Sequence, residues 1–197
     1  THRCVNLSDG AHIENLAAIE LLRRRCKYII IGDGEADPHL HFSGLATLMR
    51  CAYIDLGIDI KIDLDAIRLR KPHGDSDGAT SGPHWTLGTI TYPRKARNGK
   101  GEEGYLLYLK SSFSGDESEM IREYRHRNPA FPHQSTADQF FDEDQFEAYR
   151  ALGHHIAEHA LQATGHVADQ QMRFCDFEAW FADLRQKTHG VQPLSTL

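Results

Sequence analysis

The stretch that decides the fold lies near the start of the chain, where residues 4–33 read CVNLSDGAHIENLAAIELLRRRCKYIIIGD. Residues 4–7 form a short strand-like run. Apolar residues then recur at helical spacing from Ile13, and the arginines at 23–25 would complement the negative end of a helix dipole. Residues 27–31 are nearly continuously apolar, which is typical of a strand covered on both faces. This strand–helix–strand order predicts a parallel sheet with helical crossovers.

The next segments continue the alternation of helix and strand. Asp37 and Pro38 predict the N-cap and first turn of a helix that Gly57 ends. From 58 to 64, isoleucine and leucine alternate with charged residues, which predicts a half-exposed strand. The chain therefore begins with a predicted β-α-β-α core.

The whole chain is expected to form one α/β unit over residues 1–197. Its β-α-β-α core covers 1–69 and is followed by a polar, Gly/Pro-rich loop at 70–84. Residues 85–110 predict a long hairpin, with strands at 85–92 and 104–110, added to a mainly parallel sheet. Residues 111–197 predict a helical extension.

The helical extension carries one capping signal and two apolar faces. Ser135 and Asp138 have the spacing of a capping box. The two expected helix faces are formed by Phe146, Tyr149, Leu152 and Ile156, and by Phe174, Phe177, Phe181 and Leu184.

The composition is ordinary for a globular protein and excludes some classes of function. The 22 basic and 28 acidic residues give a net charge of −6, and no basic stripe suggests nucleic-acid binding. No apolar run approaches the ~20 residues needed to span a bilayer. The four cysteines (Cys4, Cys26, Cys51 and Cys175) are widely spaced, which favours reduced core thiols and a cytoplasmic location.

The 13 histidines raise the question of a metal site. His155 and His159 stand four residues apart on an expected helix, a spacing that can hold a metal ion. The motif H-E-x-x-H is absent, and the segment ALGHHIAEHALQ is largely a polar helix face. We therefore expect no metal and no cofactor. A metal-dependent hydrolase that uses these histidines is an alternative, which stoichiometric zinc would reveal.

Asp9 is the candidate catalytic residue. By themselves, Ser8, Asp9 and Gly10 are common capping and turn residues. However, residues 5–38, VNLSDGAHIENLAAIELLRRRCKYIIIGDGEADP, resemble the aspartate-bearing region of patatin-like lipid acyl hydrolases. The segments WTLGTITYP, GYLLYLKSSFSGDE and NPAFPHQSTADQFFDEDQFEAYRALG resemble the C-terminal part of large bacterial members. The resemblance covers the chain to about residue 160.

The resemblance implies a partial three-layer fold and a Ser-Asp dyad in which Asp9 is the general base. Gly10 and Ala11 would leave room for an acyl ester. The substrate would be a lipid or phospholipid, cleaved through an acyl-serine intermediate without a metal. Membrane-surface association of the full-length protein is an open alternative, as is a homodimer through an exposed sheet edge.

The nucleophile of that family lies in G-x-S-x-G well before the aspartate. The chain starts at Thr1, just before the predicted strand, so we expect it to be the C-terminal portion of a longer polypeptide. Gly74 to Gly78 formally match the motif. However, no strand enters this segment, and two aspartates flank Ser76, so we interpret it as a solvated loop. A non-catalytic binding or scaffold domain that keeps the fold is the competing interpretation.

Overall fold

The structure is a computed structural model, and it describes residues 9–68, 80–94, 101–135, 137, 139–163 and 176–189. The strand expected at 4–7 and the Gly74–Gly78 segment lie outside these residues. The described elements, in chain order, are η1 (Gly10–His12), α1 (Ile19–Arg23), β1 (Tyr28–Asp33), α2 (Ser43–Leu56), β2 (Asp59–Lys61), η2 (Asp65–Ile67), β3 (Trp85–Tyr92), β4 (Glu102–Lys110), α3 (Glu119–Arg127), α4 (Glu143–Gln162) and α5 (Asp176–His189).

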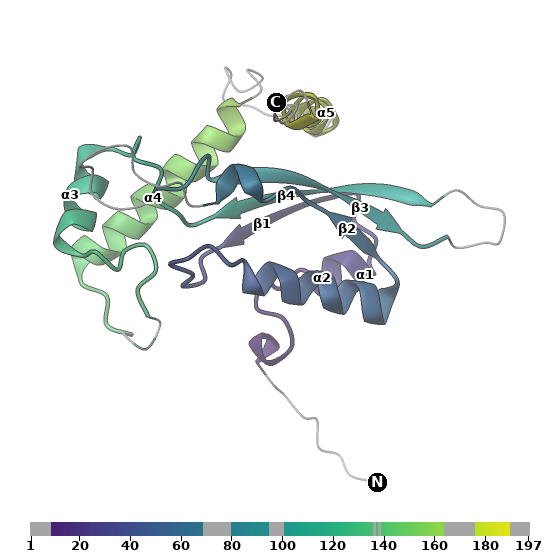
Figure 1. The fold of residues 1–197 in the computed structure, drawn as a ribbon, viewed down its shortest axis with the longest axis horizontal. Helices are drawn as coiled ribbons and strands as arrows, with labels where there is room; N and C mark the ends of the chain where they lie inside the picture. The colour runs from purple at the N-terminus through teal and green to yellow at the C-terminus, as the bar shows by residue number, and fades with distance from the viewer. Residues whose placement is uncertain are drawn as a thin grey trace, which may run out of the picture.

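The four described strands form one mixed sheet in the order β1-β4-β3-β2 (Figure 1). β4 pairs in parallel with β1 and antiparallel with β3, which pairs antiparallel with β2. Strands β1, β2 and β4 therefore run in one direction. The segment β1-α2-β2 is the expected crossover between parallel strands.

The hairpin differs from the expectation in its place. Strands β3 and β4 lie between β1 and β2, so the hairpin supplies the centre of the sheet and is not an addition to it. The sheet is mixed, whereas we expected it to be mainly parallel. Successive residues Leu106, Leu107 and Tyr108 of β4 are each no more than 1% exposed. Because neighbouring side chains in a strand point to opposite faces, β4 must be covered on both faces, as a central strand is.

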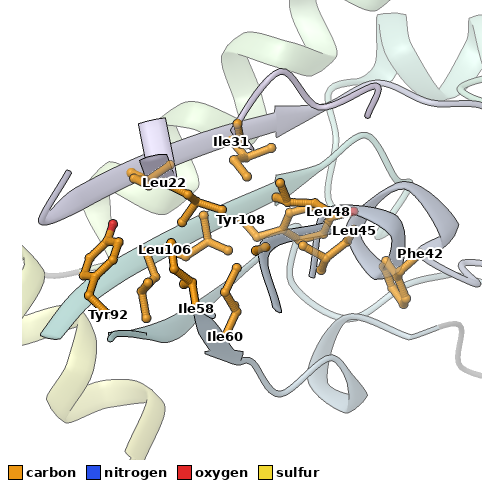
Figure 2. Packing of buried hydrophobic residues seen from close by; sticks show 14 of the residues in the cluster. Leu22, Ile31, Phe42, Leu45, Leu48, Ile58, Ile60, Tyr92, Leu106 and Tyr108 are labelled. Atoms are coloured by element: carbon orange, nitrogen blue, oxygen red, sulfur yellow. The ribbon is translucent and has the colours of Figure 1, made fainter. Parts of the chain in front are cut away.

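Helices cover both faces of the sheet. Figure 1 shows α1 and α2 on one face and α5 on the other. Figure 2 shows Leu45 and Leu48 of α2 beside Ile31 and Tyr108 of the sheet, within the largest of the three hydrophobic clusters. On the opposite face Leu107 of β4 packs with three residues of α5, namely Trp180, Phe181 and Leu184. The described part of the chain is thus an α/β structure.

Helix α1 is much shorter than the sequence pattern predicts. The carboxylate of Glu14 accepts hydrogen bonds from the backbone N–H groups of Ala18, at 2.9 Å, and Ile19, at 3.2 Å. Ala17 has a positive φ of 56°, which no α-helix allows. The expectation of a helix from Ile13 was wrong. The Glu14 side chain accepts from the N–H groups of Ala18 and Ile19, which in such a helix would donate to backbone carbonyls.

Helix α2 ends where expected but begins later. The Asp37 carboxylate accepts from the N–H groups of His41, at 2.9 Å, and Phe42, at 2.7 Å. It therefore closes a loop, and the helix itself starts at Ser43 after a left-handed Phe42. Gly57 ends the helix in the left-handed conformation with φ of 64°.

The C-terminal helices form a further core beside the sheet. The side chain of Asp142 caps α4 by accepting from the N–H of Gln145 at 2.7 Å, so the cap is not at Ser135. Asp138 lies outside the described residues. Of the expected face, Leu152 and Ile156 are buried and Tyr149 packs against the same core, whereas Phe146 is 62% exposed. The buried face of α4 is formed by Gln145, Ala148, Leu152, Ile156 and Ala160.

No helix among the described residues is long and apolar enough to cross a membrane.

Candidate functional site

Asp9 lies on the surface, immediately before η1. Its main-chain carbonyl accepts a hydrogen bond from the N–H of His12 at 3.2 Å. Both Asp9 and Gly10 are exposed, and a Cβ atom added at Gly10 would meet no atom within 4 Å. Ala11 follows in the same short helix. The backbone around Asp9 is therefore open to an approaching ligand.

The segment after Asp9 is attached to the carboxyl end of β1. The side-chain amide of Asn15 donates to the Glu35 carboxylate at 2.6 Å. Glu35 stands two residues beyond the last residue of β1, and its main-chain carbonyl accepts from the ammonium of Lys110 at 2.8 Å. Ligand sites of open α/β sheets lie at this end of their strands.

A buried ion pair holds this end of the sheet together. The Lys110 ammonium lies 2.9 Å from a carboxylate oxygen of Asp33, and both side chains are 1% exposed. The hydroxyl of Tyr108 donates to the other carboxylate oxygen. Burial, followed by the hydrogen bond to Asp33, raises the pKa of Tyr108, so the phenol remains a donor. The ion pair is closed to solvent, so its role is structural: Lys110 holds the main chain at Glu35 in place beyond the end of β1.

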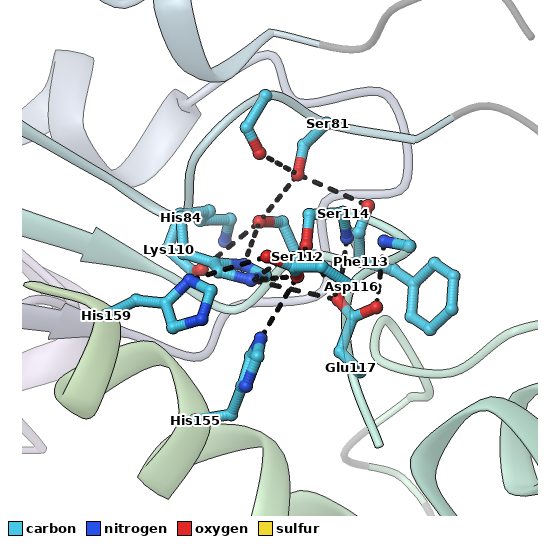
Figure 3. Close-up of polar contacts among 12 residues, drawn as sticks. Ser81, His84, Lys110, Ser112, Phe113, Ser114, Asp116, Glu117, His155 and His159 are labelled. Atoms are coloured by element: carbon cyan, nitrogen blue, oxygen red, sulfur yellow. Dashed lines mark hydrogen bonds and ion pairs between the residues drawn. The ribbon is translucent and has the colours of Figure 1, made fainter. Parts of the chain in front are cut away.

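A second group of polar side chains, the His84 cluster, lies where α4 approaches the sheet. It joins one residue just before β3, one from the turn between β4 and α3, and two from α4, namely His84, Asp116, His155 and His159 (Figure 3). Their possible metal-binding atoms all lie within 4.8 Å of one another. One Asp116 oxygen is 3.1 Å from Nε2 of His155, and the other is 3.5 Å from Nδ1 of His159.

The side chains of the His84 cluster range from buried to exposed. His84 is 1% exposed and Asp116 is 54% exposed. Burial lowers the pKa of the His84 imidazole, which favours the neutral ring. Burial opposes ionisation of Asp116, but hydrogen bonds from Ser114 and His155 outweigh it and lower the pKa of that carboxyl. A neutral imidazole beside a carboxylate can bind a cation.

The sequence revealed only half of this cluster. The i, i+4 spacing of His155 and His159 places both rings on one face of α4, with ring centroids 4.1 Å apart. Neither His84 nor Asp116 belongs to a motif, and they stand 32 positions apart in the sequence. Only the tertiary structure brings their side chains to the helix.

Among the described cysteines, Cys26 and Cys51 are free thiols.

Comparison of the chain with protein-family models, with curated proteins and with solved structures finds no match.

Proposed function

We propose that this chain is the Asp-bearing C-terminal part of a serine lipid acyl hydrolase, in which Asp9 is the general base. The observation that carries the proposal is the position of the Asp9 segment. Asp9 is exposed beside an open Gly10, and the Asn15–Glu35 contact attaches the segment to the carboxyl end of β1. This supports a role at a ligand site rather than in the core.

The chemistry requires a serine supplied from outside this chain. Its hydroxyl becomes an effective nucleophile when Asp9 accepts its proton. Attack on the acyl carbonyl then gives an acyl-serine, and Asp9 returns the proton to the leaving oxygen, which departs as the alcohol. Water then hydrolyses that ester, again with Asp9 as proton acceptor. Because Gly10 and Ala11 have little or no side chain, a fatty-acyl ester can approach the carboxylate. We propose a phospholipid or related lipid as the substrate.

The edge of the sheet supports a partner segment. β1 is the outer strand on its side among the described strands, and its Ile30 side chain is 47% exposed. An apolar outer strand pairs readily with another strand. We propose that the polypeptide carrying the serine covers this edge. A homodimer through the same edge is the outcome expected when that partner is absent.

The test uses the longer polypeptide that contains the nucleophile, assayed with a fatty-acyl ester. Asp9→Asn keeps the shape of the side chain and removes the proton acceptor, so kcat should fall by at least ~10² with little change in KM. Asp55→Asn, at an exposed position of α2, is the matched control and should retain activity.

Two results would overturn the proposal. Near wild-type turnover by Asp9→Asn with an intact fold would exclude the dyad and favour a scaffold role. The 197-residue chain alone should show no turnover. Turnover that disappears in Ser76→Ala would instead identify the Gly74–Gly78 segment as the nucleophile loop.

A further inference from the structure

We propose that the His84 cluster is a zinc site that ties α4 to the sheet. Three imidazoles and one carboxylate converge there, and each offers one ligand atom. This is a donor set of nitrogen and oxygen atoms that suits zinc, a tetrahedral ion of borderline softness. The site is separate from the Asp9 segment, and its test does not depend on the acyl hydrolase proposal.

The donor atoms are already near the required geometry. Ligands of tetrahedral zinc lie ~2.0–2.2 Å from the ion, which separates neighbouring ligand atoms by roughly 3.4 Å. The Asp116 oxygens stand 3.1 Å, 3.5 Å and 3.8 Å from ring nitrogens of the three histidines. The largest separation in the cluster is no more than 4.8 Å. Small rotations of the partly exposed side chains of His155 and His159 on α4 are enough to close this difference.

The buried histidine is held in orientation by its neighbours. Nδ1 of His84 lies 3.1 Å from the hydroxyl of Ser112, which can itself donate to the carbonyl of Lys110 at 3.4 Å. The hydroxyl then accepts from Nδ1–H, and the lone pair of Nε2 points into the cluster. Metal-binding histidines are commonly oriented in this way through their second nitrogen.

One contact must be exchanged when the ion enters. The hydroxyl of Ser114 lies 3.0 Å from Nε2 of His84 and also donates to Asp116. This hydroxyl can turn to Glu117, whose carboxylate oxygen is 3.1 Å away. The Glu117 carboxylate also accepts from the N–H groups of Ser114 and Gly115, at 2.7 Å and 2.8 Å. The turn thus keeps its internal hydrogen bonds while Asp116 is released to the ion.

The ion would have a stabilising role. The four protein ligands fill a tetrahedral shell, so no position remains for an activated water. The ligands come from three segments that are distant in the chain and meet only when it is folded, so the ion binds the folded state in preference to the unfolded state. We therefore expect zinc to stabilise the fold and not to hydrolyse a substrate.

The experiment measures zinc content and thermal unfolding of the untagged chain after chelation and dialysis. Wild-type protein should take up one zinc per chain. At a free zinc concentration ~100-fold above Kd, the unfolding temperature should rise by about 5–10 °C. Cobalt should replace zinc and give the visible absorption of a tetrahedral ion. Magnesium and calcium should cause no comparable shift, because they need six or more oxygen ligands.

The variants separate the site from incidental binding by surface histidines. The double variant His155→Ala/His159→Ala and the single variant Asp116→Asn change exposed or partly exposed ligands, and both should lose the zinc-dependent shift. His154→Ala is the control, since His154 is 63% exposed on the same helix and pairs with Glu158.

The proposal predicts that His154→Ala binds zinc as the wild type does. It would be overturned by a wild-type chain that takes up no zinc, or by equal loss of zinc in His154→Ala and the double variant. Equal shifts with magnesium or calcium would also overturn it, because they would show a general cation effect. His84→Ala is avoided because the side chain is buried and its loss could prevent folding.

Discussion

Replacing Lys110 by methionine tests the buried ion pair at the carboxyl end of β1 and β4. Methionine keeps most of the length and the apolar stem of lysine but removes the ammonium group. That group lies 2.9 Å from the Asp33 carboxylate and 2.8 Å from the Glu35 carbonyl, and its side chain is 1% exposed. The substitution would leave the Asp33 carboxylate buried without its counter-charge.

The expected cost follows from that burial. Breaking a buried ion pair by removing one partner destabilises proteins by ~3–5 kcal/mol, because the remaining charge has lost both water and its counter-ion. Asp33 keeps its hydrogen bonds from Tyr108 and from the N–H of Glu35, at 2.8 Å for the latter, which favours the lower part of this range. About 3 kcal/mol corresponds to a fall in unfolding temperature of roughly 6–12 °C for a chain of this size.

The assay is urea unfolding followed by circular dichroism, with four proteins forming a double-mutant cycle. Asp33→Asn keeps the shape of the carboxylate and strands the Lys110 ammonium instead. The double variant removes both charges and should be more stable than the sum of the two single effects predicts, by at least ~2 kcal/mol. Lys61→Met is the control, since Lys61 is 78% exposed and lies 3.9 Å from Asp59.

Exposed ion pairs contribute only ~0–1 kcal/mol, so the control should be close to wild type. A Lys110→Met protein as stable as the Lys61→Met control would refute the reasoning. Additive effects of the two single variants would refute it as well, because they would show that Asp33 and Lys110 do not act as a pair.

Three further predictions concern a glycine, a histidine and the sheet edge. Gly88→Ala should destabilise the fold by ~1–3 kcal/mol, since its Cβ would lie 2.9 Å from the Ile62 Cβ and 2.9 Å from a backbone carbonyl, and thermal unfolding measures this cost. Burial lowers the pKa of His133 to about 4, so below pH ~6.5 the unfolded chain binds a proton that the folded chain rejects until about pH 4, and stability falls across that window. Because the His133 side chain is only partly buried, we expect it to account for about 1–2 kcal/mol of the fall in the free energy of unfolding between pH 7 and pH 4.5. This part of the fall should be absent in His133→Gln. A pH dependence unchanged in the variant would show that His133 is not the group responsible. The chain alone should self-associate through β1, and Ile30→Lys should shift it toward monomer in analytical ultracentrifugation, whereas equal association of both proteins would place the contact elsewhere.

The amino-acid sequence by itself determined the elements whose signals are local. The strand at Trp85–Tyr92 was predicted with its observed bounds, and the end of α2 at Gly57 was also correct. These features depend on alternation, apolar runs and the conformational freedom of one glycine, which are properties of neighbouring residues. The catalytic role of Asp9 rests on a resemblance to a family and remains a prediction.

Only the tertiary structure decided how these elements meet. The hairpin lies between β1 and β2 because β4 can bury both of its faces there, and no local pattern specifies the order of strands in a sheet. The early helix was shortened by the Glu14 carboxylate, whose capture of backbone amides competes with helical hydrogen bonds of similar strength. The His84 cluster arises because two histidines on one face of α4 meet His84 and Asp116 from distant segments. Such contacts join segments that are distant in the chain and depend on packing across the whole fold. Patterns among neighbouring residues therefore do not predict them.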